Sequence, residues 1–268
     1  MFDYHVHTTH SADCNTPIEA SCEAAIATGV TEVAFTDHID HEPSGMCYGF
    51  YDYEKYMASI RSARDRYGDR LTILAGAEVD FNRRIKDDVE RFLERHEYDF
   101  VIGSVHYGED GVLIFPEYFD RRSIDDVFRE YYEELHAAAD TGWFDTIGHI
   151  DLPKRYAPAT AGEYDPMRYR ESLEAIFRTL IANGTSFEIN TSGIRQAPRA
   201  SMPSAQIVEL YARMGGRLVT MGSDSHVPNT IGAGFVRTFT MLELAGITEV
   251  SRFRNRVREQ VPISKLRA

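Results

Sequence analysis

Short apolar runs alternate with longer stretches of helical periodicity along the whole chain. The apolar runs predict seven strands, at residues 2–6, 32–35, 71–75, 100–102, 146–147, 186–190 and 218–222. Nearly every position in these runs is hydrophobic, as is typical of strands that are covered on both faces. The repeated order of strand and then helix favours one distorted parallel (β/α)7 barrel of the TIM type over an open sheet.

Helices are predicted between the strands, and most begin and end at residues that suit helix termini. They span about 16–29, 52–67, 86–96, 123–142, 165–184, 203–216 and 233–245. Thr16 is expected to cap the first helix, with Pro17 at its first position. Ser123 is expected to cap the fourth helix, and Gly142 to end it. The pattern at 250–258 fits a strand and a helix equally well.

Loops are predicted at 107–122 and 152–165. The first is long enough to be a lid or a substrate-binding segment rather than a plain connection. Tyr118 and Phe119 in the first loop are candidates for stacking on a substrate ring.

The composition is that of an ordinary globular chain, with 268 residues of which 43% are hydrophobic and 26% charged. We expect one domain over 1–268. A net charge of −13 argues against binding to long nucleic acid or to an anionic membrane. The three cysteines are odd in number and lack CxxC spacing, so they predict reduced thiols and a cytoplasmic location. No apolar run approaches the roughly 20 residues that span a bilayer, and the N-terminus lacks the features of a signal peptide.

Imidazoles and carboxylates follow the predicted strands repeatedly. Nine such residues stand at these positions: His5, His7, Asp13, His38, Glu78, His106, His149, Asp224 and His226. In a parallel barrel all of them converge on one rim. Crowded carboxylates repel each other, and divalent metal ions, which prefer imidazole and carboxylate ligands, relieve this cost. At roughly three protein ligands for each ion, the set suits two to three ions, with Glu78 as the bridging residue.

Each element alone has an ordinary explanation, because a single His-x-His is usually two unrelated histidines and an aspartate after a strand is often a helix cap. Recurrence at the strand ends favours the metal site. The other four histidines are expected to have ordinary structural roles. His136 is expected to be a hydrogen-bonded core residue, and His96 to end an acidic helix. His10 and His41 are expected to lie in loops.

Two arginines follow strands near the same rim. Arg195 comes after the strand at 186–190, and Arg155 comes after the strand at 146–147. A guanidinium beside several metal ions indicates an anionic substrate, most naturally a phosphate. The alternative for each is a surface salt bridge, and Lys154 is expected to face solvent. The chain has no Gly-rich phosphate loop and no G-x-S-x-G motif that would indicate other chemistry.

The chain resembles the polymerase and histidinol phosphatase (PHP) superfamily of metal-dependent phosphoesterases, and within it the histidinol-phosphatase branch. The resemblance covers nearly the whole chain. The motifs that carry it stand at residues 5–7 (His-Val-His), 36–38 (Thr-Asp-His), 76–78 (Gly-Ala-Glu), 103–106 (Gly-Ser-Val-His), 148–149 (Gly-His) and 222–226 (Gly-Ser-Asp-Ser-His). The branch is indicated by residues 7–13, 151–156 and 190–195.

The resemblance implies a distorted (β/α)7 barrel with a trinuclear centre of Zn, Fe or Mn ions. It implies one metal at His5, His7, Glu78 and Asp224, a second at Glu78, His106 and His149, and a third at Asp13, His38 and His226. Relatives often carry histidine at the position of Asp13. The resemblance also implies that Arg155 and Arg195 grip the substrate phosphate, while Glu42 and Glu117 are candidates for contacts with the rest of the substrate.

The activity implied is the hydrolysis of L-histidinol phosphate to L-histidinol and phosphate, in histidine biosynthesis, by attack of a metal-bridging hydroxide. Glu78, Asp224 and His226 are expected to act in catalysis as well as in metal binding. The alternatives are a related phosphatase that acts on a nucleotide or a sugar phosphate, and a metal-binding relative without activity. The partner expected in each active case is a small phosphomonoester.

Overall fold

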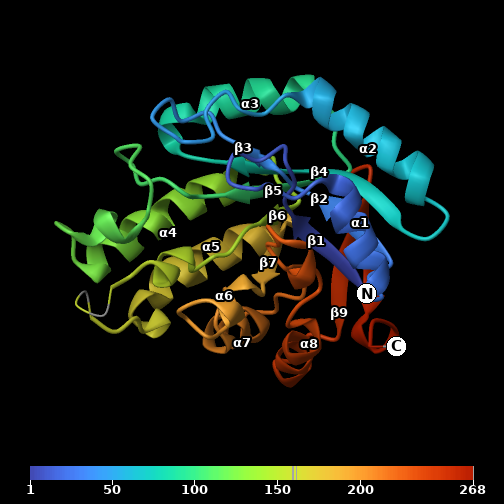
Figure 1. Cartoon of the computed structure of the whole chain (residues 1–268). Coiled ribbons are helices and arrows are strands. Elements are labelled where there is room, and N and C mark those ends of the chain that lie inside the picture. Colours follow the sequence, from blue (N-terminus) through green and yellow to red (C-terminus); the bar gives the residue numbers. More distant parts are fainter. Residues whose placement is uncertain (159, 161, 268) are drawn as a thin grey trace.

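Parallel strands form the centre of the computed structural model, which describes residues 1–158, 160 and 162–267. In spatial order they are β1 (Phe2–Val6), β2 (Glu32–Phe35), β4 (Thr72–Asp80), β5 (Phe100–Ser104), β6 (Thr146–Ile147), β7 (Ser186–Asn190) and β8 (Val219–Gly222). A two-residue strand, β3 (His38–Ile39), pairs in parallel with the end of β4. The predicted distorted (β/α)7 barrel is confirmed (Figure 1). The predicted loop at 152–165 lies partly outside the described residues.

The first and last strands of the barrel meet at one end. The backbone of Ser225 bonds to His7 (2.9 Å) and to His5 (3.3 Å), which joins the segment after β8 to β1. The buried carboxylate of Asp3 accepts a further hydrogen bond from the backbone N–H of Ser223, at 2.9 Å. These contacts close the barrel by pairing residues that are more than 200 positions apart.

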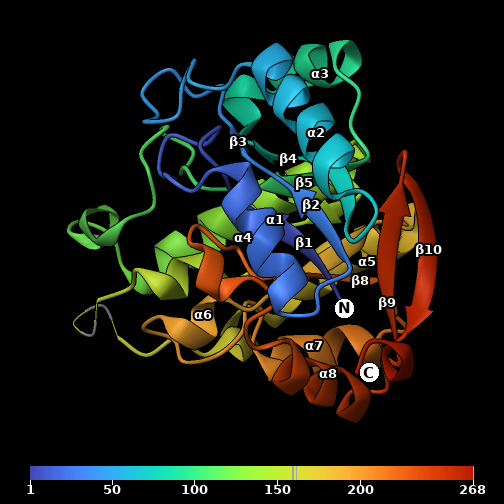
Figure 2. The same cartoon turned by 45° about the vertical axis from the view of Figure 1, so that its right-hand side comes forward.

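Helices surround the sheet (Figures 1 and 2). They are α1 (Ile18–Ala27), α2 (Tyr53–Tyr67), α3 (Lys86–Arg95), α4 (Ile124–Thr141), α5 (Arg170–Asn183), the short α6 (Ser192–Arg195), α7 (Ala205–Arg213) and α8 (Phe235–Leu244). Ser123 caps α4 in a capping box with Asp126, as predicted for that serine. Gly142 ends α4 in the left-handed conformation, with φ 66°, which confirms its expected role.

The capping prediction for α1 was wrong. This helix begins after Pro17, and no side chain caps it. The Thr16 hydroxyl donates instead to the carbonyl oxygen of His226, at 2.8 Å. The Thr16 hydroxyl, which the local sequence predicts as the cap of α1, is therefore used in a contact between the loop before α1 and the loop after β8.

The ambiguous segment at 250–258 lies in an antiparallel hairpin of β9 (Glu249–Arg254) and β10 (Val257–Pro262). The Phe253 ring packs on Tyr4 and on Phe100, at the N-terminal ends of the barrel strands. Arg256, at the turn, pairs with Asp145 just before β6. Figure 2 shows the hairpin at one side of the barrel, away from the long loops. The hairpin thus covers the floor of the barrel and leaves the opposite rim for the site.

Candidate metal centre

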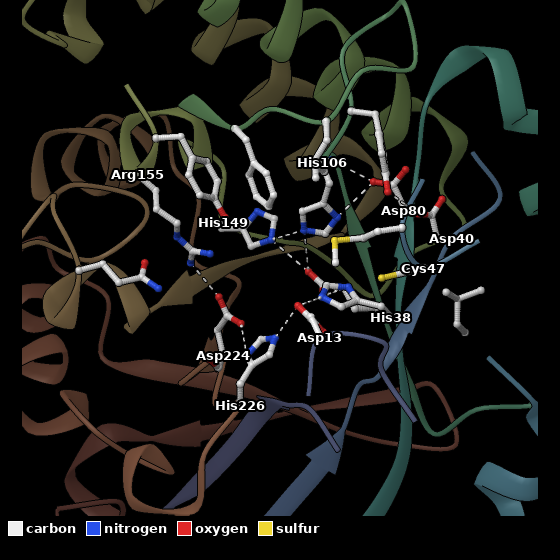
Figure 3. Close-up of a pocket in the computed structure, with 18 residues that line it drawn as sticks. Asp13, His38, Asp40, Cys47, Asp80, His106, His149, Arg155, Asp224 and His226 are labelled. Atoms are coloured by element: carbon white, nitrogen blue, oxygen red, sulfur yellow. Dashed lines mark hydrogen bonds and ion pairs between the residues drawn. The ribbon is translucent and has the colours of Figure 1, made fainter. Parts of the chain in front are cut away.

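The structure brings all nine predicted ligand residues to one end of the barrel. Figure 3 labels six of them: Asp13, His38, His106, His149, Asp224 and His226. The positions of the nine residues in the strands differ in part from the prediction. His5 lies within β1, as in the predicted strand at 2–6, whereas Glu78 lies within β4 rather than after it. Strand β4 extends past Glu78 because its last residues pair with β3 and β5. Glu78 therefore rises from the barrel interior into the middle of the cluster.

The first group consists of His5, His7, Glu78 and Asp224. The Nε2 atoms of His5 and His7 lie 3.0 Å apart. His5 Nε2 lies 3.2 Å from Glu78 Oε2 and 3.9 Å from Asp224 Oδ1. His7 Nε2 lies 3.4 Å from Glu78 Oε2 and 3.5 Å from Asp224 Oδ1. Asp224 adopts a left-handed backbone conformation, with φ 51°, a conformation that costs free energy for most residues but is more common for aspartate. The loop after β8 therefore has a left-handed residue at the position whose carboxylate belongs to the first group.

The second group lies on the other oxygen of Glu78. His149 Nε2 is 3.0 Å and His106 Nε2 is 3.5 Å from Glu78 Oε1, and the two nitrogens are 3.2 Å apart. Because Oε2 faces the first group and Oε1 faces the second, the Glu78 carboxylate lies between them. This is the geometry of a bridging ligand.

The third group lies nearer to solvent. Asp13 Oδ2 is 3.1 Å from His226 Nε2 and 3.5 Å from His38 Nε2. His38 Nδ1 also approaches Glu78 Oε2, at 3.0 Å. The side chain of Asp13 is 35% exposed, whereas that of Glu78 is 1% exposed. The three groups therefore share Glu78 and open outward at Asp13.

These distances fit a centre that holds divalent cations. Two ligands of one tetrahedral zinc ion, each about 2.05 Å from the metal, lie about 3.3 Å apart. The contacts of 3.0 to 3.5 Å between neighbouring ligand atoms surround this value. Glu78 Oε2 is buried and makes no hydrogen bond to any described residue, although three imidazole nitrogens lie 3.0 to 3.4 Å away. Cations among these atoms satisfy both the carboxylate and the imidazoles.

Burial and neighbouring charge act on the histidines in opposite directions. Burial, together with two nearby imidazoles, lowers the pKa of His7 to about 3. Burial lowers the pKa of His106 to about 4. Burial also opposes protonation of His5, but two buried glutamates outweigh it and raise the pKa of His5 well above its ordinary value. Neutral His7 and His106 are in the protonation state that metal ions require of imidazole.

A pocket of about 270 Å³ opens over the three groups. Arg155 and Asp224 lie on one side of it, and Asp40 and Asp80 lie on the other (Figure 3). The long loop at 107–122 contributes Leu113 and Phe115 to the lining, as expected for a substrate-binding loop. Tyr118 and Phe119 of the same loop are buried below the surface, so the prediction that they stack on a substrate was wrong.

The two arginines differ in their access to the pocket. Arg155 lines it and donates to Asp224 Oδ2, at 2.8 Å, and to the hydroxyl of Ser192. Arg195 is not among the lining residues, and its guanidinium donates to the carbonyl oxygen of Ser223, at 2.8 Å. Lys154 does not face solvent as expected. Its side chain is 7% exposed and pairs with Asp151 at 2.7 Å.

Three carboxylates near the metal groups were missed by the sequence reasoning. Asp40 and Asp80 line the pocket, whereas the expected Glu42 and Glu117 do not. Glu188, on β7, lies 2.6 Å from His5 Nδ1. The signal for Glu188 was a carboxylate in the middle of an apolar strand, and the signal for Asp80 was its position two residues after Glu78 on the same face of β4.

A parallel barrel with this donor set at its C-terminal rim defines a class of metal-dependent hydrolases. Residues 3–192 match the family model of the PHP domain, and the chain belongs to this family. This confirms the resemblance found from the sequence motifs.

Similar proteins within the family are histidinol-phosphatases. The chain is 30% identical to a "Probable histidinol-phosphatase" of Deinococcus radiodurans, over 88% of this chain and 90% of that protein. It is 28% identical to the histidinol-phosphatase of Lactococcus lactis, over 94% and 93%. A crystal structure of the Lactococcus lactis histidinol phosphate phosphatase, in complex with zinc, L-histidinol and phosphate, superposes with a TM-score of 0.88 at 26% identity. It covers 96% of this chain and 98% of that one.

Proposed function

We propose that this protein is a metal-dependent phosphomonoesterase that hydrolyses L-histidinol phosphate to L-histidinol and phosphate. The observation that carries the proposal is the convergence of nine candidate metal ligands at one rim, where seven of them and Arg155 line one pocket. The likeness to histidinol-phosphatases extends over nearly the whole chain, and the similar Lactococcus lactis structure holds zinc, L-histidinol and phosphate. The chain thus acts in histidine biosynthesis.

The proposed cofactors are two to three divalent ions, of Zn, Fe or Mn. The first ion would be held by His5, His7, Glu78 and Asp224, the second by Glu78, His106 and His149, and the third by Asp13, His38 and His226. When bound, such ions supply an activated water as the nucleophile and offset the negative charge of the phosphoryl oxygens. Asp224, Glu78 and His226 have a catalytic role because they hold the ions beside the reacting phosphate.

Arg155 binds and orients the phosphate. Its guanidinium lines the pocket beside Asp224, where a bound phosphate can accept an N–H from it in a charge-assisted bond. Arg195 lies close enough to Asp224 to interact with its charge, so we assign it a second, supporting role in phosphate binding.

The side of the pocket opposite Arg155 suits the organic part of the substrate. Asp40 and Asp80 place carboxyl groups on this side, which can accept hydrogen bonds from the ammonium group of L-histidinol phosphate. On the Arg155 side of the lining, Phe115 and Tyr156 pack on each other, with ring centroids 4.9 Å apart, and offer apolar surface to an imidazole ring.

The partner is a small phosphomonoester rather than a macromolecule. No helix in the described part of the chain is both long and apolar enough to cross a membrane.

The three cysteines are free and buried, which fits the reduced thiols of a cytoplasmic protein. We assign the chain to the cytoplasm, as a single phosphoesterase domain over 1–268.

The experiment measures phosphate release from L-histidinol phosphate, a nucleoside monophosphate, a sugar phosphate and an aryl phosphate, before and after chelation. Metal content is determined on the same samples. We expect kcat/KM to be highest for L-histidinol phosphate, and activity to vanish on chelation and return with Zn²⁺ or Mn²⁺.

If kcat/KM is higher for a nucleotide or a sugar phosphate, the protein is still a metal-dependent phosphatase, but the proposed substrate is wrong. A metal-loaded protein that hydrolyses none of the four compounds would overturn the proposal. Activity that survives complete removal of metal would overturn the metal-dependent chemistry.

A further inference from the structure

A buried carboxylate lies behind the first two metal groups. Glu188, on β7, is 1% exposed. Its Oε1 is 2.6 Å from Nδ1 of His5, in the first group. Its Oε2 accepts the backbone N–H of His149, in the second group, at 2.9 Å. One side chain therefore contacts both groups without lining the pocket.

The fold leaves a gap for this contact. Strand β8 lies between β7 and β1, so Glu188 must reach across a full strand to His5, over backbones that lie roughly 10 Å apart. Gly222 of β8 stands at the crossing. A Cβ atom at Gly222 would come within 2.3 Å of Glu188 Oε1 and within 2.3 Å of the Cβ of His5. Only glycine permits the two side chains to meet.

The hydrogen bonds determine which nitrogen of His5 carries the proton. The backbone N–H of His149 can only donate, so Glu188 Oε2 is an acceptor. His5 Nε2 faces Glu78 and His7, where the first ion would bind, and an imidazole nitrogen binds a metal only when it carries no proton. The ring proton of His5 is then on Nδ1, which donates to Glu188 Oε1. Carboxylates behind metal-binding histidines fix the ring and raise its basicity in this way.

We propose that Glu188 is a positioning residue that holds His5 and His149 in register for metal binding, through the gap at Gly222. This inference rests on the metal-dependent function proposed above. Glu188 touches neither the ions nor the substrate. It acts by fixing the tautomer and orientation of the His5 ring and the start of the loop that carries His149.

The test compares zinc affinity in Glu188→Gln and in a matched control, Glu134→Gln. Glu134 is equally buried and accepts two hydrogen bonds, from the backbone and the side chain of Arg83, which is not one of the proposed metal ligands. Glutamine has one acceptor oxygen and cannot satisfy the donors at both oxygens of Glu188, which are His5 Nδ1 at Oε1 and the N–H groups of His149 and of the Asn190 side chain at Oε2. We expect the Kd for zinc to rise about 10- to 100-fold in Glu188→Gln and to stay unchanged in Glu134→Gln.

A second readout is the visible absorption spectrum of the cobalt(II)-loaded protein, which reports ligand geometry at the metal. The spectrum should change in Glu188→Gln and not in the control. Two further variants keep the carboxylate. Glu188→Asp is one methylene too short to cross β8, and Gly222→Ala blocks the crossing, so both should weaken zinc binding as Glu188→Gln does.

Wild-type zinc affinity and an unchanged cobalt spectrum in folded Glu188→Gln would overturn the inference. If that variant does not fold, as judged by circular dichroism, the same outcome in Glu188→Asp and Gly222→Ala decides against it. A wild-type protein that binds zinc but hydrolyses no phosphomonoester would overturn the proposed function alone, because the comparison of zinc affinities would stand.

Discussion

Glu78 is central to the site because its two oxygens face different histidines. Oε2 lies among the first and third groups and Oε1 lies beside the second. A neutral side chain of the same shape removes the charge without leaving a cavity. The role of this residue can therefore be tested without disturbing the packing around it.

We predict that Glu78→Gln lowers kcat/KM by about 10²-fold or more. The negative charge of Glu78 would contribute several kcal/mol to holding the metal ions, and glutamine lacks this charge. Bound metal should fall by at least one ion per chain, measured by elemental analysis. Glu117→Gln, at an exposed carboxylate away from the pocket, should keep full activity and metal content. Full metal occupancy in Glu78→Gln would contradict the bridging role.

Arg155 is the arginine that lines the pocket. We predict that Arg155→Ala lowers kcat/KM for a phosphomonoester by about 10²-fold. The variant Arg155→Lys should recover only part of this activity, because lysine cannot bind a phosphate with two parallel N–H groups. Arg195→Ala should have a smaller effect in the same direction, because this residue does not line the pocket. Arg91→Ala, at an exposed ion pair, is the control for a lost surface charge. Steady-state kinetics measures all four, and an unchanged Arg155→Ala would refute its role in phosphate binding.

At the scale of the element, the same type of capping signal was right for one helix and wrong for another. Ser123 caps α4 because its hydroxyl has no competing partner across the barrel among the described residues, and the bond to the backbone N–H of Asp126 forms at 3.1 Å. Thr16 is next to the rim, where the carbonyl oxygen of His226 takes its hydroxyl. Local capping is therefore predictable where the helix begins on the surface and less so where it begins at the site.

We predict that Ser123→Ala destabilises the protein by about 1 kcal/mol, since it removes the cap of an 18-residue helix. Ser172→Ala, within α5, should be neutral or slightly stabilising because alanine is the better helix former. Urea denaturation of both variants measures the difference. Equal free energies of unfolding for the two would show that the cap contributes nothing.

At the scale of the molecule, stability and chemistry are placed at opposite ends of the barrel. The floor is sealed by the hairpin of β9 and β10, where the Tyr4 hydroxyl donates to Glu32 Oε1 at 2.5 Å and accepts from the backbone N–H of Phe253 at 2.8 Å. The rim carries the charged cluster and the pocket. Parallel barrels generally divide their residues in this way.

We predict that Tyr4→Phe lowers the free energy of unfolding by about 1–3 kcal/mol, because it removes the side-chain hydrogen-bond partner of Glu32 Oε1 and of the backbone N–H of Phe253. It should leave kcat/KM and metal content unchanged. Tyr53→Phe, at the surface, where the hydroxyl bonds to the backbone of Glu97, should cost less than about 0.5 kcal/mol. Loss of activity in folded Tyr4→Phe would show that the two ends are coupled.

The sequence by itself determined the order of strands and helices and the nine residues that meet at the rim. Apolar strands covered on both faces and residues at their carboxyl ends have a fixed relation in a parallel barrel, so His38, His106 and His226 could be placed without coordinates. Local chemistry also determined helix ends such as Gly142, where a left-handed residue is needed.

Only the tertiary structure decided which groups share a partner and which residues reach the pocket. Glu188 serves His5 because Gly222, 34 positions later, leaves a gap in the strand between them. Arg155 faces the pocket while Arg195 turns to a backbone carbonyl, although both follow barrel strands. Periodicity encodes which end and which face of an element a side chain occupies, whereas these contacts depend on distances between elements that are far apart in the chain.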